Sequence, residues 1–156
     1  MIPFPNIAPE IFSIQIWGLN LSLRWYALAY ILGFILALWI MKICVRRPRL
    51  WANNEAPLSV EQADSFLTYL IIGVILGGRI GYILFYNLDF YISHPSQMIR
   101  VWDGGMSFHG GLLGVIIATI IFGKKNSQNP LKFLDLISIA APIGIFFGRI
   151  ANFINS

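Results

Sequence analysis

Long apolar runs alternate with short polar segments along the whole chain. Apolar residues dominate four segments, at residues 23–43, 66–88, 108–122 and 133–154. Because a helix needs ~20 apolar residues to cross a ~30 Å hydrocarbon core, this pattern predicts about four transmembrane helices. The third segment has about 15 residues and is expected to begin in a loop that dips into the membrane. The predicted fold class is all-α, a polytopic membrane helical bundle in which residues 1–156 form a single membrane domain.

The N-terminal residues predict an arm outside the membrane. Residues 1–10 hold three prolines and no basic residue, whereas a secretory signal peptide begins with positive charge. The apolar stretch at 11–21 is too short to span and is expected to lie along the interface. Trp17 and Trp25 are placed to anchor the chain there.

Composition agrees with the membrane interpretation. Hydrophobic residues make up 57% and charged residues 12%, about half the ~25% of soluble globular chains, and the mean hydropathy is +0.71. This composition excludes a disordered chain and disfavours a soluble domain. The single Cys44 excludes a disulfide within the chain and a multi-cysteine zinc site. No cofactor loop or metal-ligand spacing stands out, so we expect no cofactor.

Basic residues predict the topology. The net charge of +4 is not taken to indicate nucleic acid, because the basic residues lie at the ends of apolar runs. Seven of the eleven fall at the end of the first segment, in the loop after it, or between the third and fourth segments, a side that the positive-inside rule assigns to the cytoplasm. The N-terminus is therefore predicted to lie outside. These seven residues are Lys42, Arg46, Arg47, Arg49, Lys124, Lys125 and Lys132.

Two arginines lie inside apolar segments. Arg79 and Arg149 lie about nine and six residues before the outer ends of the second and fourth segments, or roughly 13 and 9 Å deep at ~1.5 Å per residue. Tyr26 and His109 begin the first and third segments, so all four segments bring polar groups to the outer leaflet. Since the segments offer almost no acid, a lipid phosphate is a candidate partner for the guanidinium groups. A structural ion pair or snorkelling is the alternative.

Glycines surround His109. The pairs Gly104–Gly105 and Gly110–Gly111 permit close backbone approach, and the helix start is expected to offer unpaired N–H groups to an anion. Packing glycines beside an interfacial histidine are an equally weighted alternative. Four-residue glycine spacing also predicts close helix packing at Gly73, Gly77 and Gly81, at Gly110 and Gly114, and at Gly144 and Gly148.

Four motifs follow one another across most of the chain. They are RWY at 24–26, GGRIGY at 77–82, WDGGMSFHGGL at 102–112 and GRIANFIN at 148–155. In this order they resemble the bacterial prolipoprotein diacylglyceryl transferase family. Ala151 stands where that family commonly has Gly, and Ser156 falls within the last motif, just before the family's usual glutamate. The resemblance therefore implies an N-terminal portion of a transferase domain, incomplete at its C-terminus.

The resemblance implies a reaction and its partners. The diacylglyceryl group would pass from phosphatidylglycerol to the lipobox cysteine thiol in a prolipoprotein signal peptide, forming a thioether in the bacterial cytoplasmic (inner) membrane. Membrane lipids are further partners, and no nucleic acid is expected.

Candidate site residues follow from the matched motifs. Tyr26, His109, Arg149 and Asn152 are carried over from the family, and Arg79 is added from its depth and motif. His109 is the expected base, assisted by Tyr26, and the two arginines would hold the lipid phosphate. Asn152 would orient the headgroup. The phosphatidylglycerol site is completed by Gly110 and Gly111.

Two other interpretations remain. A transporter or lipid-handling channel would also place arginines in a bundle, but residues 1–65 and 66–130 show no repeat of the kind that transporters have. A non-catalytic fragment that only binds lipid is the second. The sequence that follows Ser156 would discriminate, since continuation into a glutamate and further spans favours the enzyme.

Overall fold

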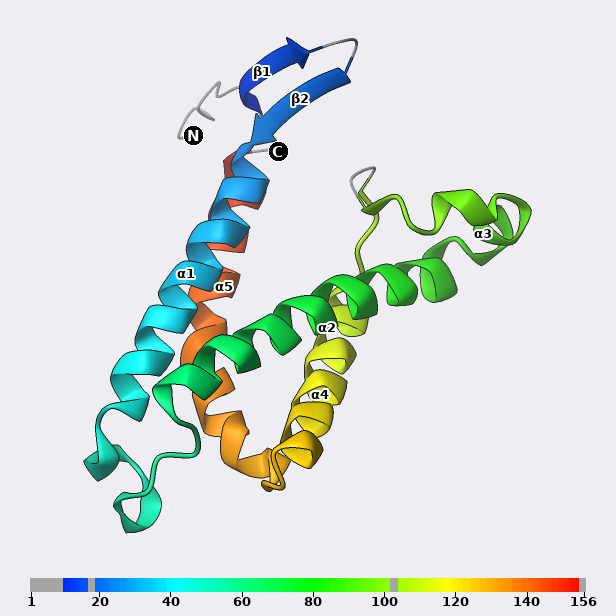
Figure 1. Cartoon of the computed structure of the whole chain (residues 1–156). Helices are drawn as coiled ribbons and strands as arrows, with labels where there is room; N and C mark the ends of the chain where they lie inside the picture. The colour runs from blue at the N-terminus through cyan, green and yellow to red at the C-terminus, as the bar shows by residue number, and fades with distance from the viewer. Residues whose placement is uncertain (1–9, 17–18, 102–103, 155–156) are drawn as a thin grey trace, which may run out of the picture. The chain divides into compact units, whose positions relative to one another are not determined.

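The computed structural model describes residues 10–16, 19–101 and 104–154 (Figure 1). Trp17, Trp102, Asp103, Asn155 and nearly all of the proline-rich arm lie outside these ranges. Within them the chain forms a β-hairpin, five α-helices and short 3-10 turns. The strands and helices are β1 (Glu10–Ile16), β2 (Leu19–Arg24), α1 (Trp25–Val45), α2 (Val60–Tyr86), α3 (Leu88–Ser93), α4 (Phe108–Lys125) and α5 (Leu134–Ile154).

Four of the described helices are long and apolar enough to cross a membrane. The candidate spans are residues 27–45, 60–86, 108–125 and 130–154. The predicted helical membrane fold with four spans is therefore confirmed. Helix α2 begins at Val60 rather than Phe66, because Ser59 and Gln62 form a capping box that starts the helix in a polar stretch. Helix α4 runs from Phe108 to Lys125, so the third segment is helical from its first residue and does not begin in a loop as expected.

The N-terminal stretch contains strands that the sequence analysis did not predict. Strands β1 and β2 pair antiparallel, with Ile14 opposite Leu21 and Ser13 opposite Ser22. Apolar and polar residues alternate strictly from Phe12 to Ile16, and again from Leu19. This period of two is typical of a strand, and it explains why the segment forms a hairpin.

The described chain divides into two compact units. One contains residues 1–56 and 135–156, with α1 and α5, and the other contains residues 57–134, with α2, α3 and α4. In the first unit, a methyl group at Gly33 of α1 would meet the Cα of Gly144 of α5 at 3.3 Å. The turn that follows α1 lies beside the start of α5 in a shared pocket, so the two helices run antiparallel.

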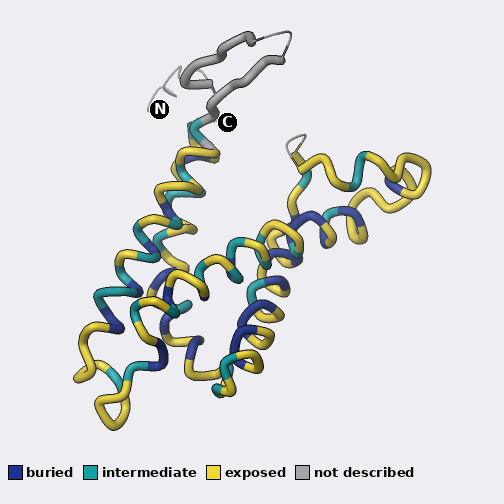
Figure 2. The backbone as a smooth tube through the Cα atoms, viewed as in Figure 1, coloured by how far each residue is buried: buried dark blue, intermediate teal, exposed yellow. Residues whose placement is uncertain are grey.

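Helices α2 and α4 pack closely through glycine. A Cβ at Gly77 would overlap the carbonyl oxygen of Gly110 and lie 2.8 Å from the Cα of Gly114. A Cβ at Gly114 would overlap the carbonyl oxygen of Gly73. Figure 2 shows buried backbone where these helices meet. The predicted small-residue packing is thus confirmed for this pair, whereas a Cβ at Gly148 would meet no described atom within 4 Å.

Aromatic rings close the other end of the second unit. The ring centroids of Phe66, Phe122 and Phe133 lie 4.9–5.5 Å apart, and all three side chains are buried. Tyr69 joins this cluster and accepts a hydrogen bond from Lys125 Nζ at 3.0 Å. Glycine contacts at one end and aromatic contacts at the other therefore hold α2 and α4 antiparallel. Much of the remaining apolar surface is exposed, as a helix facing lipid requires.

Candidate functional site

Arg79 is buried near the end of α2 and binds main-chain oxygens. Its side chain is 5% exposed. Nε donates to the carbonyl of Met98 at 2.9 Å, Nη2 to that of Gln97 at 2.6 Å, and Nη1 to those of Gly104 and Gly105. These bonds occupy all three guanidinium nitrogens. A bidentate grip on a phosphate would require some of them to break, so the phosphate-binding role of Arg79 stays a prediction.

The segment around Arg79 needs glycine at one particular place. Gly105 has a φ of +78°, and a Cβ there would enter the ring of Tyr82. A residue with a side chain would be strained by the backbone angle and would also displace Tyr82. Tyr82 forms an edge contact with Tyr91, whose ring centroid lies 5.1 Å from Cζ of Arg79. The guanidinium is therefore enclosed by carbonyls on one side and a buried tyrosine on another.

Ser107 determines how α4 begins. It is the N-cap residue, and its Oγ accepts a hydrogen bond of 3.2 Å from the N–H of Gly110. Its carbonyl accepts a bond of 2.9 Å from the N–H of Gly111, and its own N–H donates to the carbonyl of Gly78 at 2.9 Å. The expectation that the helix start leaves these N–H groups unpaired for an anion is therefore wrong at Gly110 and Gly111. A serine directly before an apolar run is the sequence signal that could have indicated this cap.

Gly110 and Gly111 are also buried. Gly110 lies against Gly77 and Gly81 of α2, while a Cβ at Gly111 would meet only Val74, at 3.8–4.0 Å. Close helix packing thus requires glycine at position 110, whereas a methyl group would fit at position 111. The predicted contact of both residues with a lipid headgroup stays a prediction.

His109 lies in the first turn of α4, two residues after the cap. Its side chain is exposed, and its ring forms an edge contact with Phe108, with centroids 5.8 Å apart. The exposure leaves the imidazole nitrogens accessible to a reactant. The structure therefore brings together Arg79, Ser107 and His109 within one unit, through the segment that precedes α4.

The other predicted residues belong to the first unit. Tyr26 is in the first turn of α1, and its side chain lies outside what the structure describes. Arg149 and Asn152 are exposed near the end of α5, and Arg149 makes no hydrogen bond or ion pair with another described residue. Because α1 and α5 are antiparallel, these three positions lie at one end of the unit. Arg79 and His109 belong to the other unit.

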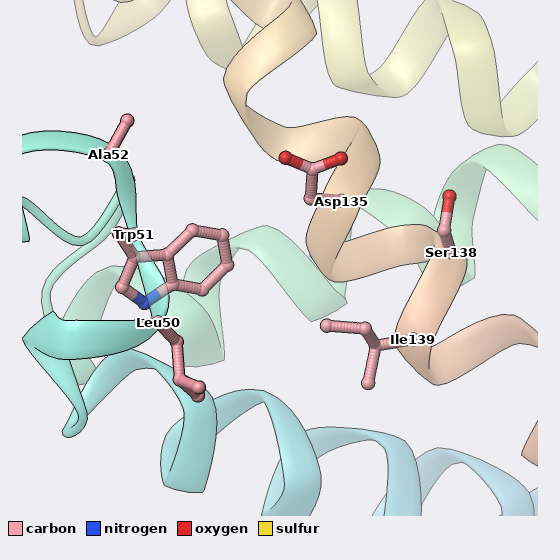
Figure 3. A pocket seen from close by; sticks show the side chains of 6 residues that line it. All are labelled: Leu50, Trp51, Ala52, Asp135, Ser138 and Ile139. Carbon is pink, nitrogen blue, oxygen red and sulfur yellow. The ribbon is translucent and has the colours of Figure 1, made fainter.

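A pocket lies at the opposite end of the first unit. It has a volume of about 400 Å³, and Figure 3 shows the indole of Trp51 and the carboxylate of Asp135 among its lining side chains. The Trp51 Nε1–H donates to the carbonyl of Cys44 at 3.0 Å. None of the predicted site residues lines this pocket, so it is distinct from the candidate site. Its lining residues are Leu50, Trp51, Ala52, Asp135, Ser138 and Ile139.

Comparison with known proteins decides which family this arrangement represents. A family model described as prolipoprotein diacylglyceryl transferase matches residues 11–156, nearly the whole chain. The chain belongs to the prolipoprotein diacylglyceryl transferase family. The resemblance of its four motifs is thereby confirmed, and the transporter or channel interpretation is not favoured.

Members of this family from several bacteria are similar over the same length. Proteins named phosphatidylglycerol–prolipoprotein diacylglyceryl transferase from Roseobacter denitrificans and Cereibacter sphaeroides are each 48% identical over 155 residues, 99% of this chain. The match covers 53% of the first protein and 76% of the second. A Rhizobium meliloti protein of the same name is 46% identical, with 99% of this chain and 54% of that protein covered. The chain thus spans about half the length of most of these relatives, and it is a multi-pass membrane protein of this transferase family.

Proposed function

We propose that this chain supplies part of the active site of a phosphatidylglycerol–prolipoprotein diacylglyceryl transferase. The family match over residues 11–156 carries the proposal. It is supported by an exposed histidine at the start of α4 and an exposed arginine near the end of α5. The donor would be phosphatidylglycerol, and the acceptor a prolipoprotein whose signal peptide carries the lipobox cysteine. These are the two substrates that the relatives' names contain.

The proposed reaction is a displacement at a glycerol carbon. The cysteine sulfur forms a C–S bond to the diacylglyceryl carbon while the C–O bond to the phosphate breaks. The electron pair of that bond leaves with glycerol-1-phosphate, and the thiol proton passes to a base. A free cysteine has a pKa of about 8.5, so the reaction at neutral pH requires a base or a positive field to provide the thiolate.

His109 is the proposed base. Its ring is exposed in the first turn of α4, where it can accept a proton from an approaching thiol. Its backbone lies two residues after Ser107, whose contacts with Gly78 and Gly110 fix the start of the helix. Tyr26 is proposed to assist from the start of α1.

Arg149 is the proposed phosphate ligand. Its guanidinium is exposed and has no hydrogen-bonded partner among the described residues, so its donors are available for a bidentate contact. Positive charge there would stabilise the departing phosphate. Asn152 lies three positions later, on the same side of the helix, and is proposed to orient the headgroup. Gly110 and Gly111 would line the headgroup site through their backbone, and Arg79 is treated separately below.

The membrane arrangement is part of the proposal. Both units would belong to one membrane domain in the bacterial cytoplasmic membrane, with the N-terminus outside. The basic residues that follow α1 and end α4 support this orientation by the positive-inside rule. His109, Arg149 and Tyr26 would then face the outer leaflet, where the signal peptide and phosphatidylglycerol meet.

The chain offers a matched pair of histidines for the test. The natural protein would be expressed in a bacterium depleted of its own transferase. Modification of that bacterium's prolipoproteins would be followed by their shift in electrophoretic mobility. Glycerol-1-phosphate release from phosphatidylglycerol would be measured with the purified protein. We expect His109→Gln to lower the rate by about 10²–10⁴-fold, as loss of a general base does. His94→Gln is the control, since His94 is also exposed and its ring contacts Phe90. Normal modification by the His109→Gln protein would contradict the proposal.

A further inference from the structure

We propose that Arg79 is a positioning residue that holds His109 in place through its hydrogen bonds to the main chain at residues 97–98 and 104–105. The inference rests on the proposed function, because it assigns His109 a role in the reaction. It gives Arg79 a task other than phosphate binding.

The contacts of Arg79 connect residues distant in sequence. Its guanidinium joins two consecutive carbonyls, those of Gln97 and Met98, to the carbonyls of Gly104 and Gly105. The beginning and the end of this loop are thus tied to one side chain of α2. No acidic side chain contacts this guanidinium among the residues that the structure describes, so carbonyl dipoles and the Tyr91 ring stabilise its charge.

A short path leads from Arg79 to His109. Gly78, the preceding residue, accepts the N–H of Ser107 at 2.9 Å, and Ser107 caps α4 through the N–H of Gly110. One turn after Gly78, Tyr82 packs against Gly105. Three neighbouring positions of α2 therefore fix the segment that leads into α4, and His109 follows the cap by two residues.

Only an arginine fits these contacts. Its planar group presents donors from three nitrogens in fixed directions, whereas lysine offers a single nitrogen on a flexible stem. A lysine at position 79 would keep the charge but could not reach both ends of the loop in the same geometry. An error of 1 Å in the position of a catalytic group can lower a rate by about 10²-fold.

Hydrogen exchange provides a test that does not depend on enzymatic activity. In the purified native protein, Arg79→Met should speed exchange at the amides of residues 97–101 and 104–107 by at least tenfold. The amides of residues 62–72 of α2 should keep their wild-type rates. Arg49→Met removes an exposed arginine from the other unit and is the control. Equal acceleration throughout the protein would show a general stability role and overturn the proposal.

Kinetics tests the connection to His109. Arg79→Met and Arg79→Lys should each lower kcat for glycerol-1-phosphate release by at least tenfold, with KM for phosphatidylglycerol changed less than threefold. In a His109→Gln background, Arg79→Met should lower the residual rate by less than threefold, because the positioned group is already missing. A tenfold rise in KM with unchanged exchange would make Arg79 a phosphate ligand and overturn the proposal, as would fully multiplicative losses in the double variant.

A second variant tests the same loop with Arg79 intact. Gly105→Ala places a Cβ against the Tyr82 ring at a positive φ, which should displace the loop. The same acceleration of exchange at residues 97–101 and 104–107 and the same loss of kcat are expected. If the Arg79→Met protein does not accumulate, these two measurements on Gly105→Ala test the proposal by themselves. A Gly105→Ala protein with wild-type exchange and kcat would overturn the proposal. Wild-type protein without transferase activity would instead contradict the proposed function, and the exchange result on Arg79 would still stand.

Discussion

Ser107 donates its peptide N–H to the carbonyl of Gly78 at 2.9 Å, and this bond joins the start of α4 to the middle of a buried turn of α2. The same serine caps α4 through its side chain. One residue thus sets both the position of the helix and the direction in which its first turn emerges. The backbone position of the exposed His109, two residues later, therefore depends on Ser107.

Loss of this cap should loosen the first turn of α4. Ser107→Ala removes the acceptor for the Gly110 N–H, and we expect a loss of about 1 kcal/mol of stability. Exchange at the Gly110 amide should rise about fivefold, while Ser107→Thr should restore most of the protection. Ser138→Ala, on the exposed surface of α5, is the control and should change neither quantity. Wild-type exchange at Gly110 in the alanine variant would contradict the cap.

The glycine contact between α2 and α4 should not tolerate a methyl group. Gly114→Ala places a Cβ on the carbonyl oxygen of Gly73, so the helices must separate. We expect a loss of about 1–3 kcal/mol, measured as a lower unfolding midpoint in detergent. Gly144→Ala makes the same change in α5, where the new Cβ meets no described atom within 4 Å, and it should keep the wild-type midpoint or raise it. Equal midpoints for Gly114→Ala and wild type would argue against the close contact.

Arg149 should contribute through the geometry of its guanidinium as well as its charge. If Arg149 binds the phosphate of phosphatidylglycerol, Arg149→Ala removes hydrogen bonds to a charged group and should lower kcat/KM. Each lost bond is worth about 1.5–3 kcal/mol. The measurement is kcat/KM for phosphatidylglycerol, and Arg149→Lys should fall between alanine and wild type because it keeps the charge without the fork. Arg46→Lys, at an exposed site in the loop after α1, should leave kcat/KM unchanged. Full activity in Arg149→Ala would exclude the phosphate role.

Topology can be tested with single cysteines. Cys44 is buried and would be replaced by alanine to give a background without thiols. Ser96→Cys and Ala52→Cys each introduce a thiol at an exposed loop position. In intact spheroplasts a membrane-impermeant maleimide should label Cys at position 96 and should label position 52 only after lysis. The reverse pattern would place the N-terminus inside.

Sequence patterns were sufficient for the helices because the bilayer sets their length. The apolar runs locate all four spans, and the four-residue glycine spacing predicts close helix packing without saying which helices pair; the structure shows it between α2 and α4. Total hydrophobicity does not predict the hairpin, whereas the period of two from Phe12 to Ile16 is a strand signal. The motifs also sufficed to identify the family.

The contacts of the candidate site are harder to predict from the sequence than the helices are. The partners of Arg79 are main-chain carbonyls, and a carbonyl has no sequence signature, so depth in the membrane suggested a phosphate instead. The general rule that the first N–H groups of a helix are unpaired fails at Gly110 and Gly111, because the hydroxyl and the carbonyl of Ser107 accept their hydrogen bonds. Joint action of Tyr26, Arg149 and Asn152 with His109 depends on how the two units meet, and it stays a prediction.

Arg79 holds the chain at residues 97–98 and 104–105 through hydrogen bonds to main-chain carbonyls. The hydrogen bonds from Arg79 to Gln97 and Met98 end on main-chain carbonyls, and these acceptors are kept when the two side chains are exchanged. A library randomised at these two positions should therefore keep the hydrogen bonds of Arg79 while the side chains presented at residues 97 and 98 vary.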